Sequence, residues 1–281
     1  IILVDPLAPV GGVPQYESVN LHVGGLALVG NLLYVADTNH GFRVFDLNNI
    51  RAVDGDSALC RNSDGSGIFG KVGTQWCADG YGYMLPEAGS YTTPTTKSDG
   101  TTIPTSCKPT FSFAGNDDRP ATNQVLSGEY CDTSGTSCNG NTSSLNGRLY
   151  QWPIDSSTNH LLAADPINFP LYVSPTKVYY MNEGQVQGVA SDNVTGAATD
   201  TYFLSSTYNS GEIYKVSPSA TAKTWSYSAS PKTSVYHPEG MYSTSSSSDH
   251  LWIVTEGDGG ATTDPHTKGR VVLYIDQNAV N

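Results

Sequence analysis

One short pattern recurs along this chain: a His or Gln stands three residues before a glycine and opens a strand-like segment. The copies are His22-Val-Gly-Gly25, Gln185-Val-Gln-Gly188 and His237-Pro-Glu-Gly240. Each is followed by an apolar strand, a turn-rich gap and a Gly-led strand of alternating character. Repetition of a strand–turn–strand–turn–strand unit is the sequence signature of radial all-β architecture. The pattern therefore predicts a fold class, and it places similar side chains at equivalent points of each unit.

Four copies of the longer unit are visible, at residues 26–47, 110–155, 185–217 and 237–276. They predict a β-propeller of four-stranded antiparallel blades; five blades fit the length best, and seven would need short blades inside the long loops. The fourth copy lacks an outer strand, so we expect the N-terminal residues 1–4 to supply it and close the ring. The alternative is a β-sandwich or barrel in which residues 1–4 pair internally.

The chain is predicted to form a single domain, residues 1–281, with two long loop insertions. Residues 51–77 are rich in Gly, Asp and Ser, and residues 92–109 are rich in Thr, Pro and Ser. Loops of this length are usually functional or mobile. We expect them to act as lids or binding loops.

Charge excludes some partners. The 281 residues carry a formal net charge of −12, with 14 Lys plus Arg. Such a surface repels a phosphate backbone, so nucleic acid is not an expected partner. No stretch approaches the roughly 20 apolar residues of a membrane span. Self-association stays open, and any signal peptide is expected to lie outside the chain, which opens on the strand-like IILVDP.

The five cysteines form no C-x-x-C pair, so zinc and thioredoxin-like chemistry receive little support. Cys60 and Cys77 bracket one polar loop, and Cys131 and Cys138 bracket another. We expect two loop-stapling disulfides from an oxidising compartment, with Cys107 left over.

Two further signals agree with that compartment. Asn141-Thr-Ser and Asn193-Val-Thr match the N-glycosylation pattern and lie in polar segments. Together with the cysteines they predict a secreted glycoprotein, extracellular or associated with a cell wall.

The repeat also predicts a site. In a propeller the first strand of each blade lines the channel, so His22, Gln185 and His237 should converge at one mouth. His40, in the turn Asn39-His40-Gly41, should lie on the same face. Convergent polar groups in a concave place are the default site hypothesis. Other polar residues expected around this mouth are Asp37, Glu129, Glu256, Gln187 and Glu239.

Each of these residues also has a structural interpretation. A His or Gln that opens a strand can simply bond a neighbouring backbone, and Asp37 can pair with turn amides. Gly25, Gly188 and Gly240 are expected where strands are too crowded for a larger side chain.

No cofactor is firmly indicated. Asp54-Gly-Asp56 and Asn62-Ser-Asp-Gly65 offer oxygen ligands that leave Ca²⁺ open, but their spacing matches no complete loop motif. Tyr91 belongs to a group of aromatic residues that could stack on sugar rings or serve as strand packing.

Several runs carry a family resemblance: HVGGLALVGNLLYVADTNHGFRVFDLNNI, GYGYMLPEAGSY, FSFAGNDDRP, SGEYC, GRLYQWPID and HPEGMY. They resemble a family of secreted bacterial and fungal proteins related to the fungal L-rhamnose-α-1,4-D-glucuronate lyases. The resemblance covers nearly the whole chain, and its first run is the most specific. It implies a β-propeller that acts on uronate-containing glycans. Family members carry more sequence ahead of IILVDP, which implies a shortened form here.

The resemblance further implies β-elimination, in which the C5 proton of a glucuronate is removed and the 4-linked rhamnose is expelled. A His can act as base because its ordinary pKa lies near 6.5. His22 is then the expected base or acid, and His40 or His237 is the second proton-handling group. Tyr83 would assist as acid. Arg119 would bind the uronate carboxylate through a bidentate pair.

The alternative function is a non-catalytic extracellular propeller that binds glycans or proteins. The acidic composition disfavours a polyanionic substrate unless a local basic patch exists. One cleft that holds His22, His40, His237 and Arg119 within reach of the same sugar would favour the enzyme. A filled channel or a scattered set of these residues would favour binding.

Overall fold

The structure is a computed structural model. It describes the chain apart from residues 39, 56, 98, 105–107, 118, 120–123, 132–146, 166–168, 182, 193–199, 208–210, 219–224, 228–231, 234–236, 244–249, 256–271 and 281. Apart from short 3-10 helices at Leu47–Asn49, Ala58–Cys60 and Gln277–Val280, every regular element in this part is a β-strand. The predicted all-β class is confirmed.

The first sheet has seven strands, ordered β2-β1-β9-β5-β4-β3, with β6 paired to β9. Their bounds are β1 Ile2–Val10, β2 Val13–Ser18, β3 Val23–Val29, β4 Leu32–Asp37, β5 Gly41–Asp46, β6 Arg51–Ala52 and β9 Tyr83–Thr92. Strands β3, β4 and β5 form the antiparallel meander predicted by the first copy of the repeat.

Three further sheets follow, each built on a similar meander. The second contains β10 Phe111–Asp117, β11 Gln124–Glu129, β12 Arg148–Pro153 and β15 Lys177–Tyr180. The third contains β16 Val186–Ser191, β17 Tyr202–Ser206, β18 Glu212–Pro218, β19 Trp225–Tyr227 and β20 Lys232–Thr233. The fourth contains β21 Pro238–Ser243, β22 His250–Thr255 and β23 Val272–Asp276. Two small hairpins are β7 Phe69–Val72 with β8 Gln75–Ala78, and β13 Ala163–Asp165 with β14 Phe169–Val173.

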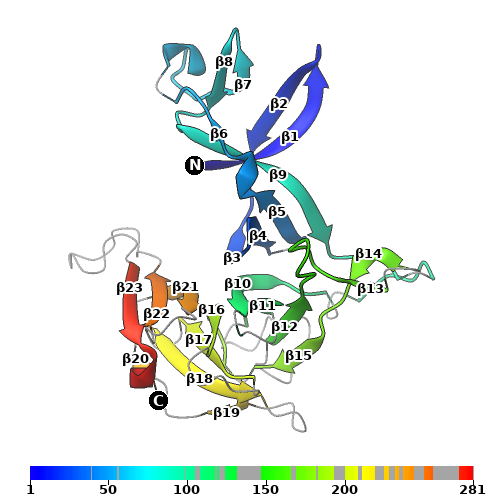
Figure 1. The fold of residues 1–281 in the computed structure, drawn as a ribbon, viewed down its shortest axis with the longest axis vertical. Coiled ribbons are helices and arrows are strands. Elements are labelled where there is room, and N and C mark those ends of the chain that lie inside the picture. Colours follow the sequence, from blue (N-terminus) through cyan, green and yellow to red (C-terminus); the bar gives the residue numbers. More distant parts are fainter. Residues whose placement is uncertain are drawn as a thin grey trace.

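The four sheets stack in chain order (Figure 1). An apolar cluster lies at each contact between consecutive sheets. Tyr34 and Phe42 of the first sheet pack with Trp152 of the second. Comparable layers join the second sheet to the third and the third to the fourth. Burial alternates along β22 of the last sheet, where Leu251 and Ile253 are buried while Trp252 and Val254 are exposed, whereas β17 of the third sheet is buried throughout.

The predicted propeller is wrong. In the described part no sheet closes, and the sheets differ in strand number. Residues 1–4 do not join the last sheet; Ile2 pairs in parallel with Met84 of β9, and β1 also pairs with β2. A repeat in the sequence specifies a local meander, whereas ring closure depends on a partner strand far away in sequence. The hairpins β1–β2 and β7–β8 lie at the end of the molecule remote from β16–β23 (Figure 1).

The insertion at residues 51–77 is more regular than expected. It contains β6, β7 and the first part of β8, and the predicted Cys60–Cys77 disulfide fastens it, with both cysteines buried. Cys131 is also disulfide-bonded. Its expected partner Cys138 lies outside the described residues, as do Cys107 and the two glycosylation asparagines.

Each of the four sheets contains one β-meander, and the strands that begin these meanders approach one another very closely. These first strands are β3, β10, β16 and β21. A Cβ at Gly24 would lie 2.6 Å from the Phe111 carbonyl oxygen. A Cβ at Gly25 or Gly188 would overlap the backbone of the next first strand, so the predicted need for glycine there is confirmed. Gly240 is different, since no described atom lies within 4 Å of the position of its Cβ. Crowding was the wrong explanation for Gly240, because no described backbone lies against it as it does at Gly25 and Gly188.

This contrast predicts opposite outcomes for two matched substitutions. Gly188→Ala should destabilise the fold by about 1–3 kcal/mol, because its methyl group meets the Glu239 carbonyl, which belongs to rigid backbone. Gly240→Ala should change stability by less than about 0.5 kcal/mol. Urea unfolding of both variants measures the difference, and equal losses would contradict the stacking interpretation.

Candidate functional site

A cavity of about 470 Å³ lies at one end of the first sheet, where β4 ends and β5 begins. His22 precedes β3, Asp37 ends β4 and His40 directly precedes β5. Antiparallel pairing of these strands brings the three residues to the same sheet end. Other residues that line the cavity are Asn20, Phe42, Arg43, Glu87, Ser90, Tyr91 and Thr92.

His40 and Asp37 form the pair with the clearest chemical potential. The Nδ1 atom of His40 lies 3.0 Å from Oδ1 of Asp37. Asp37 is buried, whereas the side chain of His40 is 75% exposed. A hydrogen bond from Nδ1 to this carboxylate fixes the ring orientation and the tautomer, so that Nε2 is the nitrogen left to accept a proton. This geometry suits an oriented general base.

His22 is held by Thr38, which follows β4. Thr38 donates from its backbone nitrogen to the His22 carbonyl over 3.4 Å, and its Oγ1 donates over 3.0 Å. The His22 Nδ1 lies 3.1 Å from the same Oγ1. Gln185 has the equivalent arrangement, because its carbonyl accepts from both groups of Thr207. The repeated position is thus structural through its backbone, and the imidazole is what distinguishes His22.

Arg43 supplies the positive charge of the cavity. Its Nε donates to Oε2 of Glu87 over 2.7 Å, and its Nη2 contacts both Asp5 and Glu87. Burial of Glu87 and its proximity to Asp5 raise the pKa of Glu87, although Arg43 acts in the opposite direction. Arg43 and Glu87 also line an adjoining cavity of about 410 Å³ that includes Asp5 and Glu17. Carboxylates therefore outnumber guanidinium groups across the two cavities.

Tyr91 forms the aromatic wall. Its hydroxyl accepts a hydrogen bond from the Leu161 backbone over 3.2 Å and lies 3.3 Å from Nδ1 of His160. Burial raises the pKa of Tyr91, so the hydroxyl stays protonated at neutral pH. The expectation that Tyr91 stacks on a sugar stays a prediction.

The remaining predicted residues lie elsewhere. Among its described lining residues the cavity includes neither Gln185 nor His237, which precede β16 and β21. Tyr83 is exposed at the start of β9, whereas the cavity is lined by the end of that strand. Gln187 and Glu239 belong to β16 and β21, and Glu256 lies outside the described residues.

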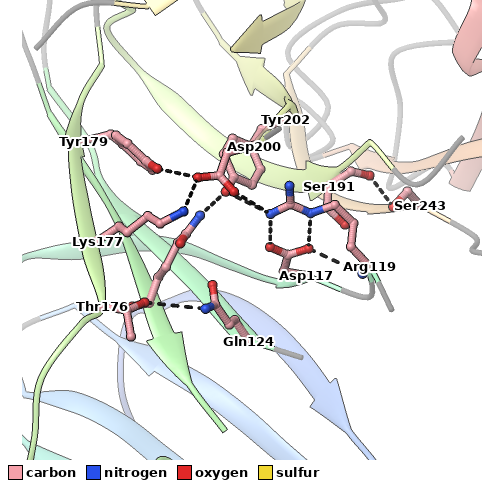
Figure 2. A network of polar contacts seen from close by, with 11 residues as sticks. Asp117, Arg119, Gln124, Thr176, Lys177, Tyr179, Ser191, Asp200, Tyr202 and Ser243 are labelled. Atoms are coloured by element: carbon pink, nitrogen blue, oxygen red, sulfur yellow. Dashed lines mark hydrogen bonds and ion pairs between the residues drawn. The ribbon is translucent and has the colours of Figure 1, made fainter. Parts of the chain in front are cut away.

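Arg119 is enclosed in a polar network between the second and third sheets, which Figure 2 shows. Its guanidinium donates to both carboxylate oxygens of Asp117 and, over 3.0 Å, to Oδ1 of Asp200. It is 6% exposed and lies 5.4 Å from the centre of the Tyr202 ring. The carboxylate partner predicted for Arg119 is thus supplied by the protein itself.

Asp200 is the other centre of this network (Figure 2). It accepts from Nζ of Lys177 over 2.6 Å and from the Tyr179 hydroxyl. Burial alone would raise the pKa of Asp200, but the hydrogen bonds from Lys177, Tyr179 and Arg119 lower it to about 2.

Glu129 is likewise committed within the protein. It is 3% exposed, and its carboxylate accepts hydrogen bonds from Nε of Arg148 over 2.8 Å and from the Tyr150 hydroxyl over 2.9 Å. The backbone nitrogen of Thr110 also donates to Oε1 of Glu129 over 3.4 Å. The acid at the end of this second strand therefore ties β11 to β12 and to the start of β10.

Metal binding gains no geometric support from the described residues. No group of three or more His, Cys, Asp or Glu side chains that could hold a metal ion occurs in the part of the chain that the structure describes. Of the residues considered for Ca²⁺, Asp54 accepts from Gln75, Asp64 accepts from Ser66, and Asp56 lies outside the described residues. No described helix is long and apolar enough to cross a membrane.

The sequence argument missed the charged group formed by Arg43 and Glu87, which line the cavity, and by Asp5, which lines the adjoining one. A signal existed for Arg43, which interrupts the run GFRVF in an otherwise apolar strand. Its acidic partners come from β1 and β9, and only the sheet order brings them together.

Comparison with known proteins adds no assignment: no protein-family model and no curated protein matches this chain. The resemblance to the glucuronate lyase relatives therefore stays a prediction.

The network around Asp200 predicts acid sensitivity. A carboxylate whose pKa is lowered in the folded state stabilises the fold above its unfolded pKa, and that contribution is lost as pH falls from about 4 towards about 2. Asp200→Asn should cost about 1–2 kcal/mol at pH 7 and remove this part of the pH dependence. Urea unfolding between pH 2 and pH 7 measures it, with Glu17→Gln on β2 as the exposed control. An unchanged pH profile in Asp200→Asn would refute the assignment.

Proposed function

We propose that this protein is a secreted carbohydrate-active protein, and that the cavity at His22 and His40 carries out β-elimination on a uronate-containing glycan. One observation carries the proposal. Two histidines from separate turns line one cavity, and a buried carboxylate orients one of them.

The cavity suits a sugar. Its volume of about 470 Å³ falls within the range of small-molecule sites. Its wall combines hydroxyl, amide and imidazole groups with the rings of Phe42 and Tyr91. Sugars present both hydroxyl groups and apolar C–H faces, so they use both kinds of contact.

Elimination needs a base and an acid in one place. Nε2 of His40 takes the C5 proton, the C5–H electrons form the C4–C5 double bond, and the C4–O4 bond breaks. The leaving oxygen takes a proton from His22. His40 is assigned as the base because Asp37 holds its ring and stabilises the imidazolium that forms.

Secretion is supported by the Cys60–Cys77 disulfide, because such bonds persist in oxidising compartments.

A second candidate is non-catalytic glycan binding, and a specific observation favours it. Of the described residues that line the cavity, Arg43 alone is an Arg or Lys, and two carboxylates already pair with it. Elimination requires the substrate carboxylate to be neutralised, whereas binding of a neutral sugar does not. The two candidates therefore differ in the glycan they accept.

Incubation with gum arabic, followed by the ultraviolet absorbance of 4,5-unsaturated uronate, tests the reaction. His40→Gln and Asp37→Asn should each lower the rate of product formation about 100-fold or more. The unfolding midpoint of His40→Gln should equal that of the wild-type protein. His22→Gln is a suited third variant, since Gln185 makes the same backbone contacts at the equivalent position.

His250→Gln serves as the matched control, because His250 lies on β22 and packs against Tyr274. Product from wild type that all three site variants retain would contradict the assigned roles. Gel retardation by a glycan without any product would support the binding candidate and overturn the lyase.

A further inference from the structure

A second, apolar pocket adjoins the polar cavity. Its volume is about 140 Å³, and it lies between the first and second sheets. Six of its ten described lining residues are aromatic or proline: Phe42, Tyr91, Pro94, Pro109, Phe111 and Trp152.

The aromatic wall is preformed. Phe42 and Phe111 stack with ring centres 4.9 Å apart, and Trp152 stands edge-on to both at 5.8 and 5.9 Å. The Trp152 indole donates to Oγ of Ser127 over 2.8 Å, so its polar atom is satisfied within the core. Phe42 and Phe111 are 2% exposed and Trp152 is 8% exposed, so the mutual contacts of the three rings hold the wall in place and a small part of the ring surface faces the pocket.

The volume matches one aromatic ring. An engineered apolar cavity of about 150 Å³ in another protein binds benzene. The pocket described here has nearly the same volume and a richer aromatic lining. A whole sugar needs more space and polar partners, which the neighbouring cavity offers instead.

The two cavities share a wall. Phe42, Tyr91 and Thr92 line both of them. A ligand that occupied both cavities would therefore place a polar ring beside His22 and His40 and an apolar ring beside Trp152.

We propose that the apolar pocket binds the aromatic ring of an aryl-substituted sugar, whose sugar part occupies the polar cavity. The sugar half rests on the proposed function. The ring half rests on the volume and lining of the apolar pocket.

Three probes separate the two halves: phenyl β-D-glucuronide, methyl β-D-glucuronide and phenol, each titrated by calorimetry. The phenyl glycoside should bind at least about tenfold more tightly than the methyl glycoside. Phenol alone should bind weakly. Equal affinity of the two glycosides for the wild-type protein would overturn the proposal.

Val173→Phe tests the location, because Val173 lines the pocket and packs against its aromatic wall. A larger side chain should fill the pocket, abolish phenol binding and remove the advantage of the phenyl glycoside. Val178→Phe is the control, since Val178 is exposed on β15. A folded Val173→Phe protein that keeps the phenyl advantage would overturn the proposal.

A measurement on the wild-type protein avoids any dependence on folding of the variant. Nuclear Overhauser contacts should join the phenyl protons to the Trp152 indole, and their absence in the bound state would overturn the proposal. If phenol is held but methyl glucuronide is not, the proposed function falls and the ring pocket stands. If methyl glucuronide binds without a phenyl advantage, the ring pocket falls and the sugar site stands.

Discussion

The close approach of the first strands is the constraint on which the rest of the structure depends. Gly25 and Gly188 let the backbone of one first strand lie against the backbone of the next. With the strands so near, the outer parts of consecutive sheets meet as apolar layers around residues such as Phe42 and Phe203. Close packing of this kind tolerates no added methyl group, because protein interiors are as dense as organic crystals.

Buried ion pairs add to the apolar packing that holds the sheets together. Arg119 with Asp117 and Asp200 links the second sheet to the third, and Glu129 with Arg148 ties strands of the second. In a chain with only 14% charged residues, these buried pairs use two of the six arginines. Such pairs are costly to break, since the partner left behind keeps a buried, unsatisfied charge. The His40–Asp37 pair differs from these buried pairs, because the imidazole of His40 is exposed to solvent while the carboxylate of Asp37 is buried.

Local features followed from the sequence, and distant pairings did not. The repeat correctly predicted each meander and the hairpin turn at His40. The two cysteines that bracket a polar loop correctly predicted the disulfide between Cys60 and Cys77. The repeat also selected His22, Asp37 and His40, which meet because all three stand at turns of one meander. The prediction of ring closure was wrong because β1 pairs with β9 and not with the last sheet, and this pairing depends on tertiary packing. Arg119 was predicted at an open site from its loop, but acids from two different sheets enclose it.

By itself the sequence determined the all-β class, the order of strands within each meander and the loop disulfide between Cys60 and Cys77. These properties depend on residues that are neighbours along the chain, where alternation, turn residues and spacing act directly. Tertiary structure alone decided which sheets stack, which acids surround Arg43 and where an aromatic pocket opens beside Tyr91. Those features require side chains from remote strands to meet. Burial and close packing select such partners, and a pattern read along one chain does not contain them.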